Sequence, residues 1–277
     1  MINMESGTIK LRKFNPQLIP KNAVVMCIGK RGTGKSTLSA DILYHLRKKF
    51  DAGICFSATE ESNNFWGKHI CDTAIHSEFN ADIYKNFIDE QRRINSKLQE
   101  PITSFALFED CMYSKIMRSN KEVRGTFFNG RHWSIFLLVT MQYVLDLPPE
   151  LRANTDFVFI LRNNQLADRE KLYKHFAGFI PSFQIFNKIM NNCTTGFECL
   201  VVNNMSRSNK IEANLFWYVA GQHGDDFKIG KRQMWEFHYR MKKVREDENA
   251  DEDGEYIASL TGIGKMSRDT KISKLNG

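Results

Sequence analysis

One eight-residue motif constrains what this chain can fold into more than any other feature of its sequence. Residues 29–36 read GKRGTGKS and satisfy the pattern G-x-x-x-x-G-K-[ST] in full, after the β-rich run VVMCIG and before a stretch of helical character. A strand, a glycine-rich turn and a helix in this order bring backbone N–H groups and the positive end of the helix together around phosphate oxygens. The motif therefore predicts an α/β fold that binds the phosphates of a nucleotide.

The residues of the motif have distinct expected roles. Its glycines let the backbone wrap a phosphate without collisions from a Cβ atom. Lys35 is expected to reach the β- and γ-phosphates of a nucleoside triphosphate, and the Ser36 hydroxyl is expected to ligate Mg²⁺. We expect the full phosphate-binding set to be Gly29, Lys30, Arg31, Gly32, Thr33, Gly34, Lys35, Ser36 and Thr37.

Short β-branched or aromatic runs alternate with longer helical stretches over most of the chain. The runs are nearly continuous in apolar character, which is typical of strands buried on both faces of a sheet. The pattern therefore predicts a mostly parallel central sheet flanked by helices. We expect strands at Ala23–Ile28, Gly53–Ser57, Phe105–Phe108, Ile135–Thr140 and Asp156–Leu161, and helices at Lys35–Phe50, Ala81–Gln99, Tyr113–Phe127 and Leu166–His175.

The pattern changes after about residue 178. A further helix is expected at Ile180–Asn192, with Pro181 in its first turn. The apolar runs Glu198–Asn203 and Leu215–Ala220 are expected to be late strands that extend the sheet in the antiparallel direction.

The uneven distribution of charge indicates where the folded part ends. We expect one P-loop domain over residues 1–244, with a core at about 20–178 and a sheet extension at about 179–244. Residues 245–277 are expected to form a charged, mobile tail, because they cannot bury much apolar surface. Residues 246–255 alone carry seven acids and no base. The rest of the chain therefore holds 39 bases against 25 acids, so its net charge is +14, whereas that of the whole chain is +7. A basic body suits a polyanionic partner, although excess charge also serves solubility alone.

Composition excludes several other classes of protein. No run of about 18 apolar residues occurs, so we expect no membrane span. The start, MINMESGTIKLRKF, lacks the apolar segment of a secretion signal, so we expect the protein to act inside a cell. The six cysteines are scattered through apolar runs without a CxxC pair or zinc-ligand spacing, and we expect them to be buried free thiols.

Nucleotide hydrolysis needs acidic groups beside the P-loop. The apolar run Thr103–Phe108 leads directly into Glu109 and Asp110, and no other apolar strand in the chain ends in paired acids. We expect Glu109 to hold Mg²⁺ through its water shell and Asp110 to act as the base toward the attacking water. The alternative is a loop that carries two solvated acids.

Other polar residues follow later strands. Gln142, just past a strand adjacent to the acids, is expected to sense the γ-phosphate or orient water, unless it is a surface loop residue. The prolines of LPPELR stiffen the turn before Arg152, which we therefore expect to be a fixed, exposed arginine that can enter a neighbouring subunit's site. The alternative is that Arg152 is an ordinary surface arginine without this role. Arg162, at the end of the next strand, is the competing candidate.

These segments together resemble a known family. The motif Gly29–Ser36, the FEDC segment Phe108–Cys111, RHWSIFLLVTMQY at Arg131–Tyr143 and the following LPPELRANTDFVFILR are similar to the DNA-packaging ATPases of large cytoplasmic DNA viruses. These are the poxvirus-type members of the FtsK–HerA superfamily of P-loop NTPases. FSATEESNNFW at Phe56–Trp66 also resembles the family, and the resemblance covers approximately residues 20–165.

The resemblance implies a RecA-like (ASCE) ATPase core that assembles into a homo-oligomeric ring and pumps double-stranded DNA into a preformed capsid, with ATP and Mg²⁺ as its cofactors. It implies nucleotide and Mg²⁺ positions at Lys35 and Ser36, acidic positions at Glu109 and Asp110, a sensor position at Gln142 and an arginine finger at Arg152. A capsid or portal-vertex protein is the implied further partner, and the host cytoplasm is the implied location. The family usually has Asp where this chain has Glu109, which leaves the division of labour between the two acids open.

Two other functions stay open at this point. A P-loop kinase would need an arginine-bearing lid, for which Gln91-Arg92-Arg93 is a weak candidate. A non-hydrolysing nucleotide switch or virion scaffold is the other, although Lys35, Ser36 and the two strand-terminal acids argue against it.

Overall fold

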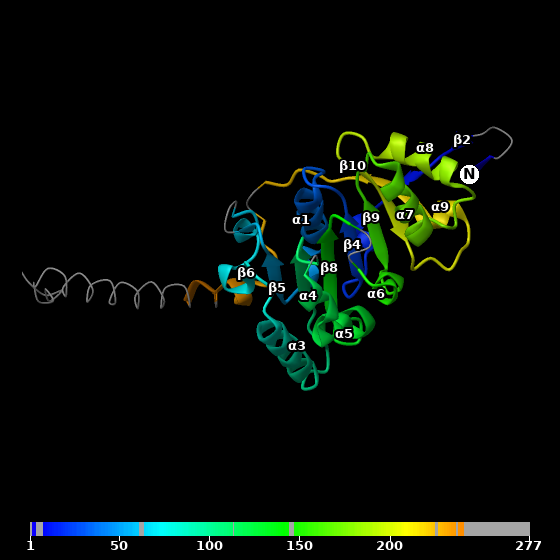
Figure 1. Cartoon of the computed structure of the whole chain (residues 1–277). Coiled ribbons are helices and arrows are strands. Elements are labelled where there is room, and N and C mark those ends of the chain that lie inside the picture. The colour runs from blue at the N-terminus through cyan, green and yellow to red at the C-terminus, as the bar shows by residue number, and fades with distance from the viewer. Residues whose placement is uncertain are drawn as a thin grey trace, which may run out of the picture. The chain divides into compact units, whose positions relative to one another are not determined.

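The chain divides into two compact units, residues 1–231 and residues 232–277. The computed structural model describes residues 2–3, 8–60, 64–112, 114–143, 147–224, 227–236 and 238–240 (Figure 1). The first unit contains the sheet and the P-loop. The charged tail expected from residue 245 onward lies outside the described residues, and its boundary stays a prediction.

A central sheet organises the first unit, and among the described residues it has nine strands. In spatial order these are β3 (Arg12–Lys13), β11 (Leu215–Val219), β10 (Glu198–Asn203), β9 (Phe157–Ile160), β4 (Val24–Ile28), β8 (Ile135–Met141), β7 (Ser104–Glu109), β5 (Ala52–Ser57) and β6 (Ile75–His76). The strands from β9 to β6 run parallel to one another. The late strand β10 is antiparallel to both β9 and β11, as its sequence predicts, and β3 pairs in parallel with β11. The short strands β1 (Ile2–Asn3) and β2 (Thr8–Ile9) form a separate antiparallel pair.

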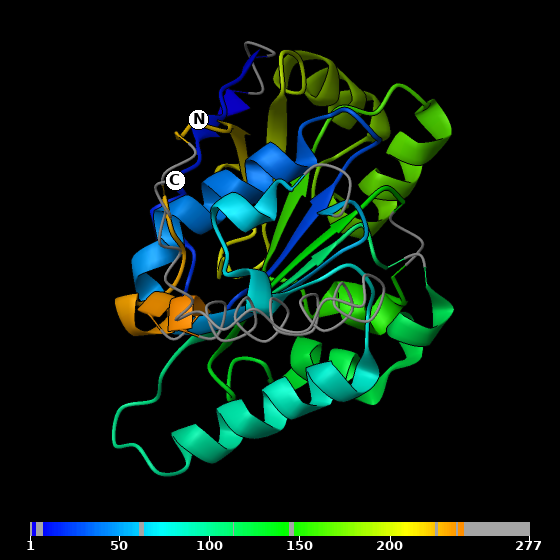
Figure 2. The ribbon, with the colours of Figure 1, turned by 90° about the vertical axis from the view of Figure 1, so that its left-hand side faces the viewer.

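Helices cover both faces of the sheet (Figure 2). They are α1 (Lys35–Leu46), α3 (Ala81–Asn95), α4 (Lys115–Ser119), α5 (Lys121–Asn129), α6 (Pro149–Ala153), α7 (Leu166–Phe176), α8 (Phe183–Cys193) and α9 (Ile211–Asn214). Short 3-10 turns lie at Pro16–Leu18 (η1), Arg47–Lys49 (η2), Trp66–Lys68 (η3) and Asp72–Ala74 (η4). Buried residues of α1 pack on one face of the sheet, whereas those of α3 to α8 pack on the other. This arrangement confirms the predicted α/β fold.

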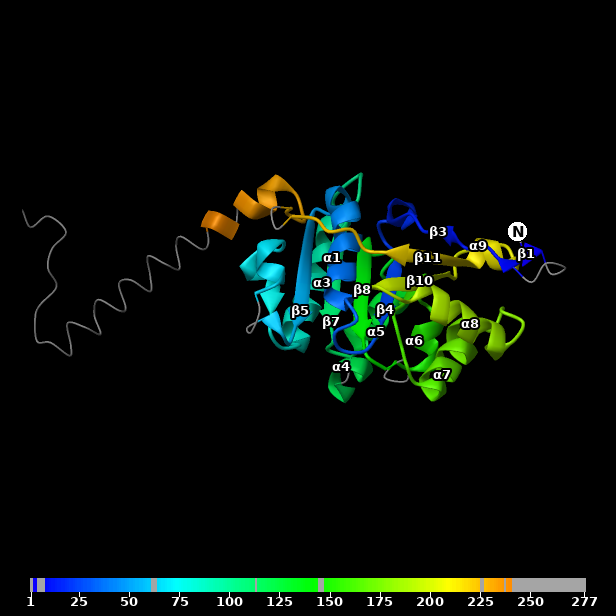
Figure 3. The ribbon, with the colours of Figure 1, turned by 90° about the horizontal axis from the view of Figure 1, so that it is seen from above.

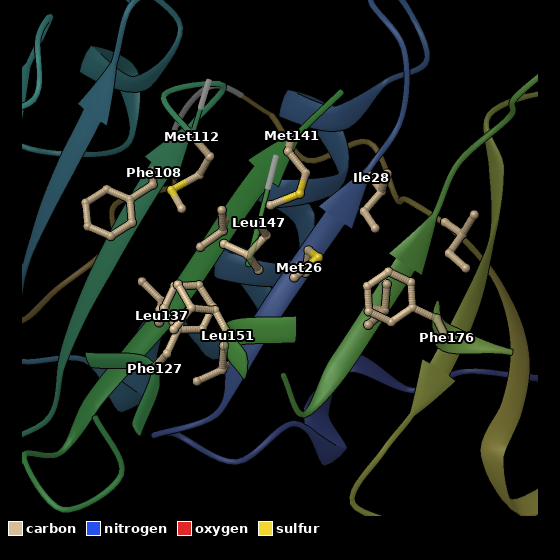
Figure 4. Close-up of a cluster of buried hydrophobic side chains, with 14 of the residues drawn as sticks. Met26, Ile28, Phe108, Met112, Phe127, Leu137, Met141, Leu147, Leu151 and Phe176 are labelled. Carbon is tan, nitrogen blue, oxygen red and sulfur yellow. The ribbon is translucent and has the colours of Figure 1, made fainter. Parts of the chain in front are cut away.

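The alternation of side chains along the strands creates two hydrophobic cores. In β4, Val24, Met26 and Ile28 belong to the core under α3 to α8, and Val25 and Cys27 belong to the core under α1. Figure 4 shows the first of these cores, in which side chains from β4 and β8 meet side chains from α5, α6 and α7. Because both faces of each central strand are buried, the strands read as continuous apolar runs in the sequence.

The expected elements are all present among the described residues, but several differ in their limits. The helix expected at Lys35–Phe50 ends at Leu46 and is followed by the turn η2, and the helix expected at Ala81–Gln99 ends at Asn95. The helix expected at Tyr113–Phe127 is divided into α4 and α5, because Asn120 has an extended backbone (ψ 133°) and its side chain caps α5. Tyr113 itself lies outside the described residues. Pro181 precedes α8 instead of lying in its first turn, because Ser182 is the residue that caps that helix.

The described residues include all six cysteines, which are expected to be buried free thiols. Cys27, Cys55, Cys71, Cys111 and Cys199 are buried free thiols, and Cys193 is a half-buried one. No helix in the described ranges combines the length and the apolar character that a membrane crossing requires.

In the second unit, Arg232 Nε donates a hydrogen bond to Glu236 Oε1 (2.6 Å).

Candidate nucleotide-binding site

The P-loop connects the end of β4 to the start of α1. Gly32 and Gly34 have positive φ angles of 76° and 92°, a conformation that side chains with a Cβ atom rarely adopt. A Cβ atom on Gly29 would lie 2.5 Å from Thr33 Oγ1 and 2.9 Å from Leu161 Cβ, so this position also has no room for a side chain. The glycines of the motif are therefore required by the backbone turn and by close packing.

Sheet topology brings the two acids to the same edge as the P-loop. Strand β8 lies between β4 and β7, and all three run parallel. Their carboxyl ends therefore meet at one edge of the sheet, as the views in Figures 1 and 3 show. Since β4 ends in the P-loop and β7 ends at Glu109, the motif and the acids converge although they are far apart in sequence.

Glu109 is a buried acid of the site, with 4% of its surface exposed. Its Oε1 accepts a hydrogen bond from the Ser36 hydroxyl. Its Oε2 accepts two more, from Ser57 Oγ (2.6 Å) and from Trp66 Nε1 (2.5 Å). Ser57 lies opposite Glu109 in the β5–β7 register, and Trp66 begins the turn η3. These three donors fix the carboxylate in contact with the first turn of α1.

Asp110 occupies a more open position just beyond β7. Its φ angle of 48° is unusual for a residue with a Cβ atom, and it turns the chain sharply at the strand end. The Asp110 N–H donates to Thr140 Oγ1 (3.0 Å), which holds the turn against β8. Asp110 Oδ2 lies 3.2 Å from Lys35 Nζ and accepts a hydrogen bond from Gln142 Nε2 (3.4 Å). The side chain of Asp110 is 25% exposed, so water can reach it.

The structure thus brings Lys35, Ser36, Glu109, Asp110 and Gln142 together, as the sequence predicts. The remaining positions of the predicted phosphate-binding set lie in the loop between β4 and α1 and in the first turn of α1. Lys30 Nζ lies 3.5 Å from Asp168 Oδ2 at the start of α7, and its carbonyl accepts a hydrogen bond from Lys35 Nζ (3.4 Å). Arg31 and Thr37 are exposed, at the tip of the loop and in the first turn of α1 respectively.

Arg152 departs from its expected position. It is 9% exposed, it lies in the short helix α6, and its guanidinium donates to the Leu147 carbonyl. The expectation of an exposed arginine is therefore wrong, because the two prolines begin a helical turn that packs Arg152 against its own loop. Arg162, the competing residue, is exposed just beyond the end of β9, where Nε donates to Asn164 Oδ1 (3.1 Å).

Several residues at the site are not identifiable from the motif alone. Ser57, Trp66 and Thr140 hold the two acids through hydrogen bonds. Ser57 is the last residue of β5, Thr140 is the next-to-last residue of β8, and Trp66 begins η3. Phe197, which is 68% exposed and has a φ angle of 68°, lies beside Gly34. The available sequence signal for Ser57 and Thr140 is their place near the carboxyl ends of parallel strands, whereas Trp66 has no such signal.

Comparison with known proteins shows which family shares this sequence. The chain is 33% identical over 240 residues to protein 088R of Invertebrate iridescent virus 3, which covers 82% of this chain and 92% of the relative. It is 29% identical over 282 residues to protein L437 of Acanthamoeba polyphaga mimivirus, which covers 98% of each chain. The chain belongs to this family of large DNA virus proteins.

The fold of the chain is similar to that of a solved viral NTPase. The genome packaging NTPase B204 from Sulfolobus turreted icosahedral virus 2, solved in complex with AMPPCP, has a TM-score of 0.55 to the chain. The match covers 74% of this chain and 100% of B204 at 14% identity, so it concerns the fold. No family model matches the chain. Together these findings show that the chain belongs to a family of large DNA virus proteins and that its fold is similar to that of the packaging NTPase B204.

The residues at this edge of the sheet fit a nucleotide with Mg²⁺. Ser36 and Glu109 are hydrogen-bonded to each other, which places a hydroxyl and a carboxylate where a hard cation finds oxygen ligands. Lys35 supplies a positive charge between the P-loop and Asp110. Among the side chains that meet here, Ser36 and Glu109 would hold Mg²⁺ and Lys35 would hold the phosphates.

Proposed function

We propose that this protein hydrolyses ATP and uses the energy to move double-stranded DNA, as the motor ATPase that packages a viral genome into a preformed capsid. The observation that carries the proposal is the pair of contacts between the P-loop and the end of β7. Ser36 contacts Glu109, and Lys35 lies 3.2 Å from Asp110. A phosphate-binding loop and two acids in direct contact are the parts that nucleotide hydrolysis requires.

The arrangement assigns different roles to the two acids. Both oxygens of Glu109 accept hydrogen bonds from fixed donors, so this carboxylate is suited to positioning Mg²⁺ together with Ser36. Mg²⁺, when bound, neutralises charge on the β- and γ-phosphate oxygens. Asp110 is more exposed and lies beside Gln142, so it is suited to accept a proton from the water that attacks the γ-phosphate. The products are ADP and inorganic phosphate.

A basic pocket supports a polyanionic partner. It has a volume of about 530 Å³ and lies between α4, α5 and α6. Its charged lining residues are Lys115, Arg118, Arg124 and Arg152. Arg124 is paired with Glu150 (3.0 Å). Lys115 and Arg118 line the same pocket from α4, and they are our candidates for contact with a DNA phosphate. The balance of 39 bases against 25 acids outside residues 246–255 agrees with such a partner.

The segment Gln91-Arg92-Arg93, the candidate for the lid of a P-loop kinase, lies in a packed helix. Gln91 is buried in α3, where its amide donates to the carbonyls of Ile102 (3.0 Å) and Trp133 (3.2 Å). Both carbonyls precede the amino ends of β7 and β8, at the edge of the sheet opposite the P-loop. Arg92 and Arg93 belong to the same helix, and Arg93 is paired with Glu90. This segment is therefore a packed helix and not a lid over the phosphates.

Ring formation, a capsid or portal-vertex partner and a location in the host cytoplasm belong to the same proposal. They are supported by membership of a family of large DNA virus proteins and by the fold shared with B204. An exposed arginine near the P-loop edge, Arg162, is available to act on a neighbouring subunit.

Translocation is tested by displacement of a triplex-forming strand from linear duplex DNA by the full chain. We expect the strand to be released with ATP and Mg²⁺, and to be retained with a non-hydrolysable analogue. The variant Lys35→Ala is expected to release none, because it cannot hold the phosphates. Release that ignores the nucleotide, or hydrolysis without any release, would contradict a translocase.

A further inference from the structure

Helix α1 carries a second polar cluster that the proposed function does not use. Its centre is Asp41, which is 1% exposed although it is a carboxylate. Asp41 Oδ1 accepts hydrogen bonds from His223 Nε2 (2.6 Å) and from the Gly221 N–H (3.2 Å). Its Oδ2 accepts a hydrogen bond from the Tyr218 hydroxyl (2.5 Å). A buried acid with this many fixed partners has a defined position in the fold.

Two histidines turn the same ring nitrogen toward this carboxylate. His45 lies one helical turn beyond Asp41, and its Nε2 is 3.5 Å from Asp41 Oδ1. His223 comes from the segment after β11, which leaves the sheet and runs across α1 in Figure 3. The His223 ring stacks on Tyr44, with 3.5 Å between ring centroids and 14° between ring planes. The carboxylate oxygen and the two nitrogens all lie within 4.8 Å of one another.

We propose that Asp41, His45 and His223 form a binding site for Zn²⁺. One carboxylate oxygen and two imidazole nitrogens are a donor set that zinc prefers over Mg²⁺ or Ca²⁺. Zinc bonds of about 2.0–2.1 Å at tetrahedral angles place neighbouring ligand atoms about 3.3 Å apart. The separation of 3.5 Å between His45 and Asp41 matches that spacing, and His223, now at 2.6 Å, has to withdraw by less than about 1 Å.

The surroundings complete the site as zinc sites usually require. The Tyr218 hydroxyl and the Gly221 N–H hold the carboxylate from the protein side, which is the support that ligating carboxylates commonly have. The side chains of His45 and His223 are 25% and 19% exposed, so solvent can supply the fourth ligand. A bound zinc ion would tie the segment after β11 to α1, the helix that begins at the P-loop.

Zinc binding by the full chain distinguishes a metal site from a purely structural contact in which His223 only donates a hydrogen bond to Asp41. The full chain, stripped of metal with a chelator and desalted, is incubated with Zn²⁺ in the absence of nucleotide, and bound zinc is measured by mass spectrometry after gel filtration. We expect one equivalent for the native sequence. We expect the affinity to fall by more than about 10-fold for His45→Ala and for His223→Ala. The matched control, His132→Ala, removes an exposed histidine elsewhere and is expected to change nothing.

Two further measurements keep the test independent of folding defects in the variants. Cobalt(II) is expected to give the visible absorption of a tetrahedral nitrogen and oxygen site, without the near-ultraviolet band of a thiolate ligand. Zn²⁺ is expected to raise the melting temperature of the native sequence but not that of His223→Ala, whereas a purely structural contact gives no metal-dependent change in either. Failure of the native chain to retain zinc, or equal retention by all three histidine variants, would overturn the site. Neither result bears on nucleotide hydrolysis.

Discussion

The Lys35 ammonium lies 3.2 Å from the Asp110 carboxylate, which links the P-loop to the residue that follows β7. Lys35 begins α1, which follows β4, and Asp110 follows β7, which is separated from β4 in the sheet by β8. Asp110 also accepts a hydrogen bond from Gln142, which follows the end of β8. The three residues come from three separate segments, so their proximity is a product of the parallel sheet.

Asp110→Asn tests the assignment of the base. The amide keeps the shape of the side chain but cannot accept a proton, so we expect the hydrolysis rate to fall by about 100-fold or more. ATP affinity should change little, because the phosphates are held by the P-loop. Steady-state phosphate release and binding of a fluorescent nucleotide measure the two effects. Asp168→Asn, which removes the acid beside Lys30, is the matched control, and equal losses in both variants would argue against a base at position 110.

Trp66→Phe tests whether the indole positions Glu109. The change keeps an aromatic ring in a fully buried place but removes the donor at 2.5 Å from Glu109 Oε2. We expect the Mg²⁺ concentration for half-maximal hydrolysis to rise about 10-fold, as is usual when a residue that orients a ligand is removed. The rate at saturating Mg²⁺ should recover most of its native value. A lower rate at every Mg²⁺ concentration, with unchanged half-saturation, would point to a packing defect instead.

Arg162 and Arg152 are expected to differ in what they affect. Arg162→Ala should reduce hydrolysis by the oligomer by about 10³-fold if this exposed residue stabilises transition-state charge in the adjacent subunit. Arg152→Ala should instead lower the free energy of unfolding by about 1–3 kcal/mol, because the Leu147 carbonyl loses a buried donor. Turnover and urea unfolding separate the two effects. A stable Arg152→Ala protein with no hydrolysis would reverse this assignment.

Lys115 and Arg118 are expected to contact DNA phosphates from the basic pocket. Their replacement by alanine should weaken duplex binding and reduce the slope of log affinity against log salt by about 0.9 for each DNA phosphate that is no longer neutralised. Hydrolysis in the absence of DNA should keep its native rate. Binding by fluorescence anisotropy at several salt concentrations gives the slope. Lys97→Ala, an exposed lysine just beyond α3, is the control, and an equal effect there would mean that the pocket has no special part.

Two buried thiols predict a loss of stability at alkaline pH. Burial raises the pKa of Cys27, and also that of Cys111, from 9.0 to about 12. In the unfolded chain these thiols ionise near pH 9, whereas in the folded chain they stay protonated. The stability that they contribute is therefore complete below pH 9 and is lost as the pH rises toward 12. Each thiol should add about 1.4 kcal/mol per pH unit to the decline in the free energy of unfolding.

Urea unfolding at intervals between pH 8 and about 11 measures this decline, and alanine variants of the two cysteines should make it shallower. The half-buried Cys193 offers a comparison in the same chain. An unchanged slope in the Cys27→Ala, Cys111→Ala double variant would show that other groups cause the alkaline loss.

Much of this fold is readable from the sequence because the central strands are buried on both faces. Apolar runs such as those ending at Ile28 and Glu109 mark strands, and the P-loop fixes where the first one ends. Contact between Glu109 and Ser36 follows once those strands are taken as parallel neighbours of β8. The two acids are identified by the apolar run that leads directly into them, and the family resemblance implies the same two positions.

What the sequence does not reveal depends on contacts between distant segments. Trp66 reads as one more apolar residue, and only the packing of η3 against β7 shows that its N–H meets a carboxylate. Arg152 reads as exposed because prolines favour turns, yet Pro148 and Pro149 begin a helical turn that buries it. The approach of His223 to Asp41 likewise depends on the path of the chain after β11.

The proposed motor requires that duplex DNA and the two acids control ATP hydrolysis by this chain. The decisive experiment follows the steady-state release of inorganic phosphate from ATP by the full chain as duplex DNA is added, for the native sequence and for Glu109→Gln. We expect DNA to raise the native rate severalfold and Glu109→Gln to stay near zero with or without DNA. A native rate that does not respond to DNA, or native turnover by Glu109→Gln, would contradict the proposed function.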